Sequence, residues 1–378
     1  MPVIIFKAVE RCNSNCIYCD VIKKRQNTIL SSSLLELVFQ RINEYLCAHP
    51  RETMTLTWHG GEVCLLGPEY FRLALEHQKK HCPQTQDRIE HLVQSNLTLL
   101  TQELIEVFRQ LGIRQIGSSY EPIPGLRGFG KNRDSDAYNR AFMRSVELLE
   151  ENNIYWGVIY VVHRKSLAIP LELFYHLTNM NLRSQPNFNM VWVYGSDEHE
   201  LAITPEEFAD FLGAIFPVWW KHRVRFPHVK PFEGIIRSLR DRNVGLVCES
   251  SGSCTYEWVY IGPEGHTSQC GKAGDYNMES YGRIQDCTLE SILHDARRDA
   301  FLQRQSLLPE TECRECRLWG ICHGGCPLES KQHYGTYMHK SPNCAATKRL
   351  IERYIEPVTG LHADFPAPVG SLSENTHA

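Results

Sequence analysis

The stretch that decides the fold is residues 3–19, VIIFKAVERCNSNCIYC. Its first part, VIIFKA (3–8), is an apolar run that predicts a buried β-strand. Its second part places cysteines at 12, 16 and 19, with C-x3-C-x2-C spacing, in the loop after that strand. Three cysteines in one loop indicate a metal site at the end of the strand.

Strand and helix patterns alternate beyond this stretch. Further strands are expected at 54–58, 89–94, 114–118, 154–162 and 187–194, and helices near 34–46, 69–81, 101–111, 135–152, 169–180 and 205–221. Ser32 or Ser33 is expected to cap the first helix, and Thr204 with Glu207 forms a capping box at the last. The alternation implies a parallel sheet with right-handed crossovers. Six β–α units are too few for a complete eight-stranded barrel, so the predicted fold class is α/β, a partial (β/α)6 TIM barrel.

Polar motifs follow four successive predicted strands. After the cysteine loop of the first strand come Gly60-Gly61-Glu62, then Ser95 and Asn96, then Ser119. The carboxyl ends of parallel strands share one edge of a sheet, where functional groups gather. Core packing does not explain four polar motifs at that edge, so the sequence predicts one functional site there.

Composition excludes several classes of protein. Of 378 residues, 42% are hydrophobic and 22% charged, as in an ordinary globular protein and unlike a disordered chain or a coiled coil. The net charge of −4 gives no global attraction to nucleic acid or to anionic lipid. We find no apolar run near the length of a membrane span and no signal peptide at the N-terminus. The expected location is the cytoplasm, with no membrane partner.

Fifteen cysteines are many for a chain without an export signal, and in a reducing compartment they favour metal ligation over disulfides. Eight lie in a second, glycine-rich region: Cys248, Cys254, Cys270, Cys313, Cys316, Cys322, Cys326 and Cys344. The strand–helix alternation stops near residue 225, and a hairpin is expected within 255–270. Metals would stabilise a region with so few apolar runs. We therefore expect domains at 1–225 and 226–350, followed by a C-terminal tail at 351–378.

The number of cysteines in the first loop distinguishes two kinds of metal. Four thiolates usually hold an iron–sulfur cubane, so three leave one iron open for another ligand. Zinc is the alternative for C-x2-C pairs, but it normally takes a fourth Cys or His nearby. The stretch from Cys12 to Cys19 offers none.

ERCNSNCIYC resembles the cluster loop of the radical S-adenosylmethionine (SAM) superfamily, and the later cysteines resemble its SPASM extension. The resemblance covers about residues 3–350. It implies that Cys12, Cys16 and Cys19 hold a [4Fe–4S] cluster whose open iron binds SAM, and that one electron cleaves SAM to methionine and a 5′-deoxyadenosyl radical. The chain would then be a radical SAM oxidoreductase.

Other SAM contacts follow from the same resemblance. Gly60-Gly61-Glu62 is similar to the motif that receives the methionine ammonium, and Ser95 and Asn96 to the ribose-side strand end. Ser119 matches the first residue of an S-x-D-G segment that here reads Ser119-Tyr120-Glu121-Pro122. Arg140 lies where some relatives place an arginine for the SAM carboxylate.

The resemblance also implies two auxiliary [4Fe–4S] clusters, three clusters in all. The first would be held by Cys248, Cys254, Cys270 and Cys326, and the second by Cys313, Cys316, Cys322 and Cys344. If cysteines bind all four irons of each auxiliary cluster, no iron is open to the substrate. This favours a role of these clusters in electron transfer.

Two substrate classes remain open at this point. We favour a maturase that takes a hydrogen atom from a ribosomally made peptide and crosslinks it, through a C–C (cyclophane) or thioether bond. The alternative is an anaerobic sulfatase maturase, which forms formylglycine from Cys or Ser. Those enzymes carry an Asp, the suspected base, directly after the third auxiliary cysteine, whereas Gly271 follows Cys270 here. Asp275 or Glu279 is the nearest replacement.

Partners follow from either chemistry. We expect a peptide or protein substrate and an external one-electron reductant of the flavodoxin or ferredoxin type. Cys12 lies too near the start for an N-terminal recognition domain, so leader recognition would need another surface of the chain or a separate leader-binding protein. An RNA-modifying enzyme is a further alternative, since residues 219–225 mix aromatic and basic side chains. A helix end with cations near its carboxyl terminus explains that stretch equally well, so nucleic acid is disfavoured.

Overall fold

The computed structural model describes residues 1–19, 27–180, 186–192, 199–241, 248, 252 and 254–366. Contacts divide the chain into two compact units. The first comprises 1–166, 172–202 and 256–297, and the second 167–171, 203–255 and 298–378. The predicted domain limits near residues 225 and 350 follow chain order, whereas these units follow contacts, so the limits stay a prediction.

The first unit contains the predicted alternation of strands and helices. Its strands are β1 (Val3–Val9), β2 (Met54–Gly60), β3 (Ile89–Gln94), β4 (Gln115–Ser119), β5 (Tyr155–Val162) and β6 (Asn187–Met190). The connecting helices are α2 (Ser32–Ala48), α3 (Gly67–His81), α4 (Gln102–Gln110), α5 (Ser135–Glu151) and α6 (Pro170–Thr178). These strands are parallel neighbours in chain order, as expected of a partial barrel.

The predicted hairpin forms, but it adds to the same sheet. Strands β7 (Trp258–Ile261) and β8 (Thr267–Ser268) pair antiparallel. Strand β7 also pairs parallel to β1, so the sheet runs β6-β5-β4-β3-β2-β1-β7-β8. The cysteine-rich region therefore contributes to the barrel unit. The short helices α10 (Gly271–Asp275) and α11 (Leu289–Leu293) follow the hairpin.

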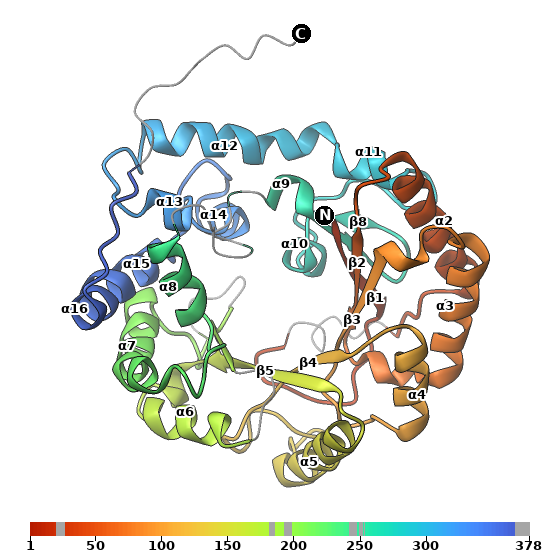
Figure 1. The fold of residues 1–378 in the computed structure, drawn as a ribbon, viewed down its shortest axis with the longest axis horizontal. Helices are drawn as coiled ribbons and strands as arrows, with labels where there is room; N and C mark the ends of the chain where they lie inside the picture. The colour runs from red at the N-terminus through yellow and green to blue at the C-terminus, as the bar shows by residue number, and fades with distance from the viewer. Residues whose placement is uncertain are drawn as a thin grey trace. The chain divides into compact units, whose positions relative to one another are not determined.

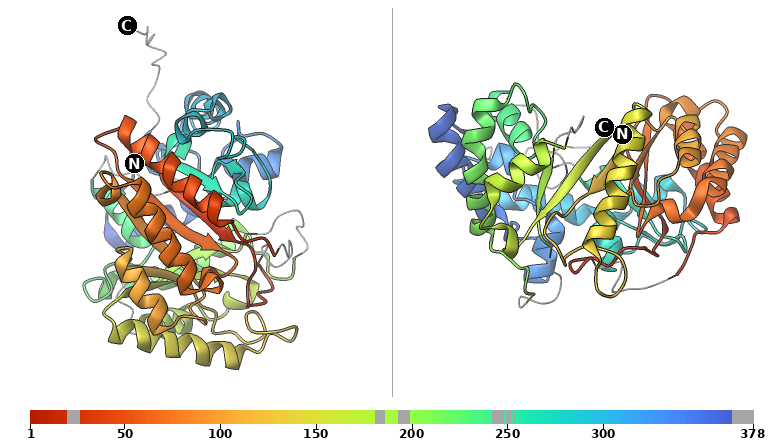
Figure 2. Two further views of the ribbon diagram at one scale, coloured as in Figure 1. Left: turned by 90° about the vertical axis from the view of Figure 1, so that its right-hand side faces the viewer. Right: turned by 90° about the horizontal axis from the view of Figure 1, so that it is seen from below.

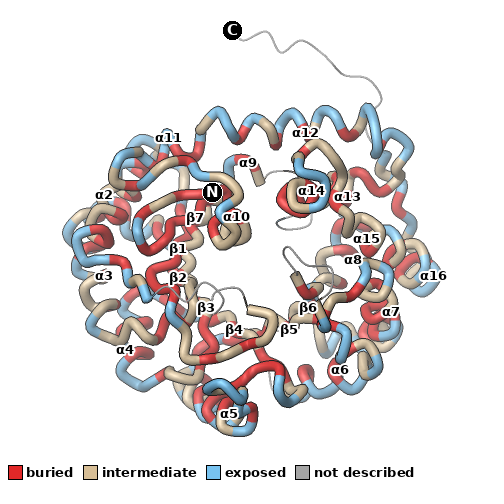
Figure 3. The backbone as a smooth tube through the Cα atoms, turned by 180° about the vertical axis from the view of Figure 1, so that it is seen from behind, coloured by how far each residue is buried: buried red, intermediate tan, exposed pale blue. Residues whose placement is uncertain are grey.

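The core of the first unit lies between the sheet and helices α2–α4. Figure 1 shows these helices along the outer side of β1–β3, and Figure 3 shows buried residues along the strands and exposed ones on the outer helix turns. Phe6 and Trp58 have ring centroids 5.0 Å apart, and Trp58 and Phe71 lie 5.1 Å apart. All three side chains are fully buried.

Side-chain caps start several helices where the sequence predicts them. The first helix is capped by Ser31, whose hydroxyl accepts from Leu34 N at 3.3 Å, and not by Ser32 or Ser33. Ser32 and Ser33 already lie within the first turn of α2, whereas the N-cap residue has an extended backbone and precedes that turn. Thr204 and Glu207 form the expected capping box of α7.

The second unit is mostly helical. It contains α7 (Pro205–His222), α8 (Phe232–Arg240), α9 (Cys254–Glu257, which ends in the first unit), α12 (Asp299–Glu310), α13 (Trp319–Cys322), α14 (Pro327–Tyr334) and α15 (Cys344–Arg349). The chain then continues through helical segments Leu350–Ile355 and Glu356–Thr359. The stretch expected as a tail therefore begins as helix, because Ile351 and Ile355 are fully buried. Residues 367–378, and residues 193–194 of the expected sixth strand, lie outside the described residues.

No helix among the described residues is long and apolar enough to cross a membrane.

Candidate functional site

Backbone hydrogen bonds hold the cysteine loop in place after β1. The amides of Asn15 and Ile17 donate to the carbonyls of Gly128 and Leu126, at 2.8 and 2.9 Å. The Ser14 amide donates to Cys12 Sγ at 3.3 Å, and the Ser14 hydroxyl lies 3.4 Å from Cys16 Sγ. The loop is therefore docked on the segment that follows β4, with two sulfurs already in a hydrogen-bonding environment.

The glycines after β2 let this loop come close. A Cβ on Gly61 would lie 2.3 Å from the Glu10 carbonyl oxygen and 2.4 Å from that of Arg11. At this closeness the Gly61 amide donates to Val9 O at 2.9 Å, and the Glu62 amide to Arg11 O at 3.0 Å. Glycine is needed at position 61 because a Cβ there would collide with the backbone of Glu10 and Arg11, which cannot move aside as a flexible side chain can.

We expect Gly61→Ala to destabilise the protein by about 1–3 kcal/mol, the usual cost of overpacking, and to lower the iron bound by the cysteine loop. Gly271→Ala is a matched control, because its Cβ would only touch Ile5 Cγ2 at 3.5 Å. Thermal denaturation and iron analysis of both variants measure the difference. Equal melting temperatures for the two variants would contradict this explanation of the glycine.

Three donors fix the carboxylate of Glu62, which is 1% exposed. Oε1 accepts from Cys64 N at 2.9 Å and from the Ser95 hydroxyl at 2.7 Å, and Oε2 accepts from Asn96 N at 2.6 Å. Burial raises the pKa of Glu62, although these hydrogen bonds oppose the rise. A carboxylate has about four acceptor positions, so Oε2 keeps room for an ammonium donor.

Asn96 links this carboxylate to the cysteine loop. Its side-chain amide donates to Asn13 Oδ1 at 2.8 Å and lies 3.8 Å from Cys12 Sγ. The structure thus brings Ser95 and Asn96, which follow the third strand, together with Glu62 and Cys12. This agrees with the expectation that the carboxyl ends of the parallel strands meet at one edge of the sheet. Ser119 is half-buried at the end of β4.

Arg127 is a site residue that the sequence reasoning missed. It is 7% exposed, and its Nε has no hydrogen-bond partner among the residues that the structure describes. Burial alone would lower the pKa of Arg127, but the acidic groups around it, first Tyr138 and Cys16, raise it well above its usual value. Arg140, the arginine expected to bind the SAM carboxylate, is exposed on α5. The glycine-rich stretch GLRGFG (125–130) was the available signal for Arg127.

A buried pair of ionisable groups lies at the ends of β4 and β5. His163 Nε2 is 2.9 Å from Glu121 Oε2, and both side chains are fully buried. The ring of Tyr18, in the cysteine loop, stacks on His163 at a centroid distance of 6.3 Å. Glu121 therefore orients His163 and, through it, Tyr18.

The sulfurs of the first loop are not gathered as the ligands of a single zinc ion would be. A zinc site brings its ligand atoms within the reach of one ion. Among the described residues, no three cysteine sulfurs lie within 4.8 Å of one another. Burial raises the pKa of Cys12 to about 12, so a positively charged metal centre is needed to hold its thiolate form.

Lys7, His59 and Asp275 form a second group on the inner face of the sheet. Lys7 of β1 is 2% exposed, is the register partner of His59 of β2, and forms an ion pair with Asp275 at the end of α10. Helix α10 lies on the side of β1 opposite to α2 and α3 (Figure 1). His59 accepts from Gly60 N at Nδ1, 2.8 Å away, which places its proton on Nε2. Burial first, and then the charge of Lys7, lowers the pKa of His59 to about 4.

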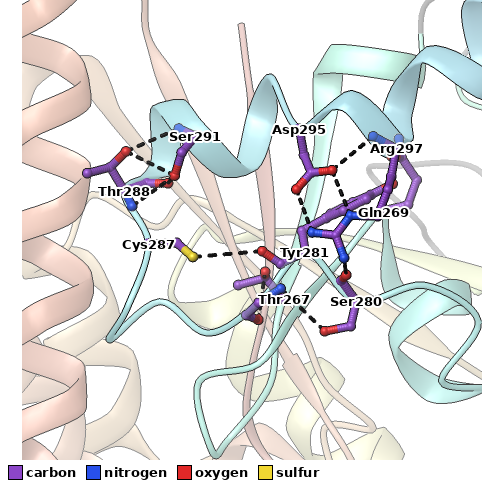
Figure 4. Close-up of polar contacts among 10 residues, drawn as sticks. Thr267, Gln269, Ser280, Tyr281, Cys287, Thr288, Ser291, Asp295 and Arg297 are labelled. Atoms are coloured by element: carbon purple, nitrogen blue, oxygen red, sulfur yellow. Dashed lines mark hydrogen bonds and ion pairs between the residues drawn. The ribbon is translucent and has the colours of Figure 1, made fainter.

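Polar contacts brace the segment that leads to Cys270. Tyr281 donates from its hydroxyl to Gln269 Oε1 at 2.9 Å, and Thr267 N donates to Gly282 O at 2.9 Å. Figure 4 shows this network continuing through Arg297 to Asp295. Cys270 follows directly and precedes the first turn of α10, so one braced segment positions both Cys270 and Asp275.

The predicted second auxiliary set lies wholly in the second unit. Cys313 is 3% exposed and packs with Leu308 and Trp319, with Cys316 beside it. A hydrogen bond from Cys322 lowers the pKa of Cys344. Of the first auxiliary set, Cys248, Cys254 and Cys326 belong to the second unit and Cys270 to the first.

Arg304 organises the cysteine loop of the second unit. It is 1% exposed and donates to the carbonyls of Gly324 at 2.6 Å and His339 at 3.1 Å. Burial lowers the pKa of Arg304, while Cys326 and other cysteines of this unit act in the opposite direction. The cation is therefore placed where it would compensate negative charge on these cysteines if they bind a metal, and the cysteine spacing alone did not predict it.

Comparison with known proteins identifies the domain that contains these residues. The model of the radical SAM superfamily matches residues 7–168. A serine-type anaerobic sulfatase-maturating enzyme of Bacteroides thetaiotaomicron is 25% identical over 84% of this chain and 80% of its own. A cysteine-type anaerobic sulfatase-maturating enzyme of Clostridium perfringens is 20% identical over 86% of this chain and 88% of its own.

Two solved structures share the fold. The enzyme anSMEcpe, with bound AdoMet and the Kp18Cys peptide, has a TM-score of 0.81 at 18% identity, covering 95% of this chain and 99% of its own. SuiB of Streptococcus suis, bound to the precursor peptide SuiA, has a TM-score of 0.60 at 13% identity, covering 91% of this chain and 76% of its own. The cysteine loop, the glycines docked on it and these comparisons lead to one conclusion: residues 7–168 are a radical SAM domain, and the chain is a radical SAM enzyme that is similar over most of its length to sulfatase-maturating enzymes.

Proposed function

We propose that this radical SAM maturase oxidises a serine or cysteine side chain of a protein to formylglycine, as a sulfatase-maturating enzyme would. The observation that carries the proposal is the similarity to such enzymes over most of the chain, 84% and 86% for the two relatives above. Peptide crosslinking, which the sequence alone favoured, becomes the second candidate. Its support is the fold shared with SuiB in complex with a precursor peptide.

Residues of this chain fit a cluster with bound SAM. Cys12, Cys16 and Cys19 would hold the cluster, and Glu62 would accept a hydrogen bond from the methionine ammonium of SAM. Arg127, whose Nε has no partner among the described residues, would bind the carboxylate of SAM. When bound, the cluster and SAM supply a one-electron cleavage that yields the 5′-deoxyadenosyl radical. The docked loop and the buried carboxylate keep these groups fixed and away from water.

The substrate carbon must then lose a hydrogen atom, an electron and a proton. The hydrogen atom passes to the deoxyadenosyl radical, and the proton leaves the substrate hydroxyl or thiol. We propose Asp275 as the proton acceptor, since Lys7 holds its carboxylate on the inner face of the sheet beside His59. The product is an aldehyde from serine, or a thioaldehyde from cysteine that water converts to the aldehyde with release of sulfide.

The electron needs an acceptor, and an iron–sulfur cluster held by auxiliary cysteines would provide one. We propose that a [4Fe–4S] cluster on Cys313, Cys316, Cys322 and Cys344 acts as this acceptor. The buried guanidinium of Arg304 supports a negatively charged centre in the second unit. An external reductant of the flavodoxin or ferredoxin type would supply the first electron.

The test uses the cluster-reconstituted enzyme with SAM, a chemical reductant and two peptides. One is the Cp18Cys peptide that anSMEcpe binds, and the other carries serine at the same position. We expect an aldehyde that a hydrazine reagent traps on at least one peptide. Formation of 5′-deoxyadenosine without any trapped aldehyde on either peptide would count against this function. A product that loses two hydrogens and does not react with hydrazine would favour crosslinking.

A further inference from the structure

Two histidines and a glutamate meet between α2 and α3, on the outer side of the sheet. His77 and His81 lie in the last turns of α3, four residues apart and so on one helix face, and Glu36 lies on α2. Figure 2 shows the two helices side by side, and they are in contact. The ligand atoms of the three residues lie within 4.8 Å of one another, and no other such group occurs among the described residues.

His77 is the observation that points to a missing ligand. Its side chain is only 9% exposed, and its Nε2 has no hydrogen-bond partner in the described part of the chain. A buried, unpaired ring nitrogen is costly, so it calls for a partner that the protein does not itself provide. Burial lowers the pKa of His77, which keeps the ring neutral and a lone pair available.

The other two residues already point toward each other. His81 Nε2 lies 2.8 Å from Glu36 Oε1. Hydrogen bonds from Lys80 and His81 lower the pKa of Glu36 to about 2, so its carboxylate is charged at neutral pH. The carboxyl end of helix α3 also favours a positive charge at this place.

We propose that Glu36, His77 and His81 form a binding site for a divalent transition metal, with zinc as the metal that suits two imidazoles and one carboxylate. Water would complete the coordination. The site lies outside the SAM domain's strand-end edge and uses none of its cysteines, so it would join α2 to α3 and leave the radical chemistry unchanged.

Lys80 is the group that opposes such a cation. Its ammonium lies 2.7 Å from Glu36 Oε1, on the oxygen that would bind the metal. The Lys80 side chain is 65% exposed, however, so its ammonium can leave Glu36 and turn into solvent at little cost in free energy. Metal binding would also rearrange the side chains slightly, because zinc bonds of about 2.0–2.1 Å hold tetrahedral ligand atoms roughly 3.3 Å apart. His81 Nε2 and Glu36 Oε1, now 2.8 Å apart, would separate to admit the ion.

The experiment measures zinc binding by the full chain with its iron–sulfur clusters loaded, so that cluster cysteines do not compete. Isothermal titration compares the wild type with His77→Ala, His81→Ala and Glu36→Gln. We expect one zinc per chain in the wild type and a loss of affinity of roughly 100-fold or more in each histidine variant. His228→Ala is the matched control, because it removes an exposed histidine that pairs with a glutamate, Glu233, at 3.4 Å.

X-ray absorption at the zinc edge identifies the ligands without interference from iron. Nitrogen and oxygen neighbours near 2.0 Å are expected, whereas sulfur neighbours near about 2.3 Å would show zinc at cysteines and overturn the proposal. Equal zinc affinity in the wild type and in both histidine variants would overturn it as well. 5′-Deoxyadenosine formation by His77→Ala should equal that of the wild type, which shows that this variant folds.

Discussion

Replacement of Cys12, Cys16 and Cys19 by alanine is expected to reduce 5′-deoxyadenosine formation to background. The three thiols are the only protein ligands proposed for the SAM-binding cluster, and their loop supplies no substitute. Iron content should fall by about four per chain, one cubane, while the iron bound through the later cysteines remains. Iron analysis and chromatography of 5′-deoxyadenosine measure both effects.

The fold should survive this triple replacement. Backbone hydrogen bonds from Asn15 and Ile17, and not the sulfurs, dock the loop on residues 126–128. Cys47→Ala is the matched control, because Cys47 is an exposed thiol on α2 that belongs to no predicted ligand set. A triple variant that keeps all its iron and its SAM cleavage would refute the assignment of the cluster to this loop.

The sequence predicted the strands and helices of the barrel because their signals are local. Apolar runs such as VIIFKA and the capping box at Thr204 need only near neighbours to act, and both appear as expected. The parallel pairing of β7 with β1 is different, since more than 240 residues separate the strands. A four-residue strand carries no local signal of its partner, so its membership in the first sheet could not be predicted.

Some residues of the candidate site could be predicted from the sequence, and others could not. Residues at strand ends, Glu62, Ser95 and Asn96, could be placed together because topology brings successive strand ends to one edge. Arg127 was missed because it comes from a loop whose path no periodicity describes. The Lys7–Asp275 pair was missed because 268 residues separate its members. Asp275 could be named as a candidate base from the sequence, but only the structure supplies the lysine that holds it.

Asp275→Asn is expected to uncouple SAM cleavage from product formation. The amide keeps the size of the side chain but is a poor proton acceptor, so aldehyde formation should fall about 10²–10⁴-fold. Formation of 5′-deoxyadenosine should stay within a few-fold of the wild type, because the cysteine loop and Glu62 are unchanged. The ratio of product to 5′-deoxyadenosine is the measurement, and Glu279→Gln, the other carboxylate named from the sequence, is the control.

The effect of Asp275→Asn on protein stability must be separated from its effect on product formation. Lys7 is 2% exposed, and removal of its partner leaves a buried charge unpaired, which typically costs about 3–5 kcal/mol. The double variant Lys7→Met/Asp275→Asn removes that charge, so its melting temperature should recover toward the wild-type value. Its product yield should stay low if Asp275 accepts the proton. Recovery of both stability and product in the double variant would mean that Asp275 only compensates the charge of Lys7, and another base would then have to act on the substrate.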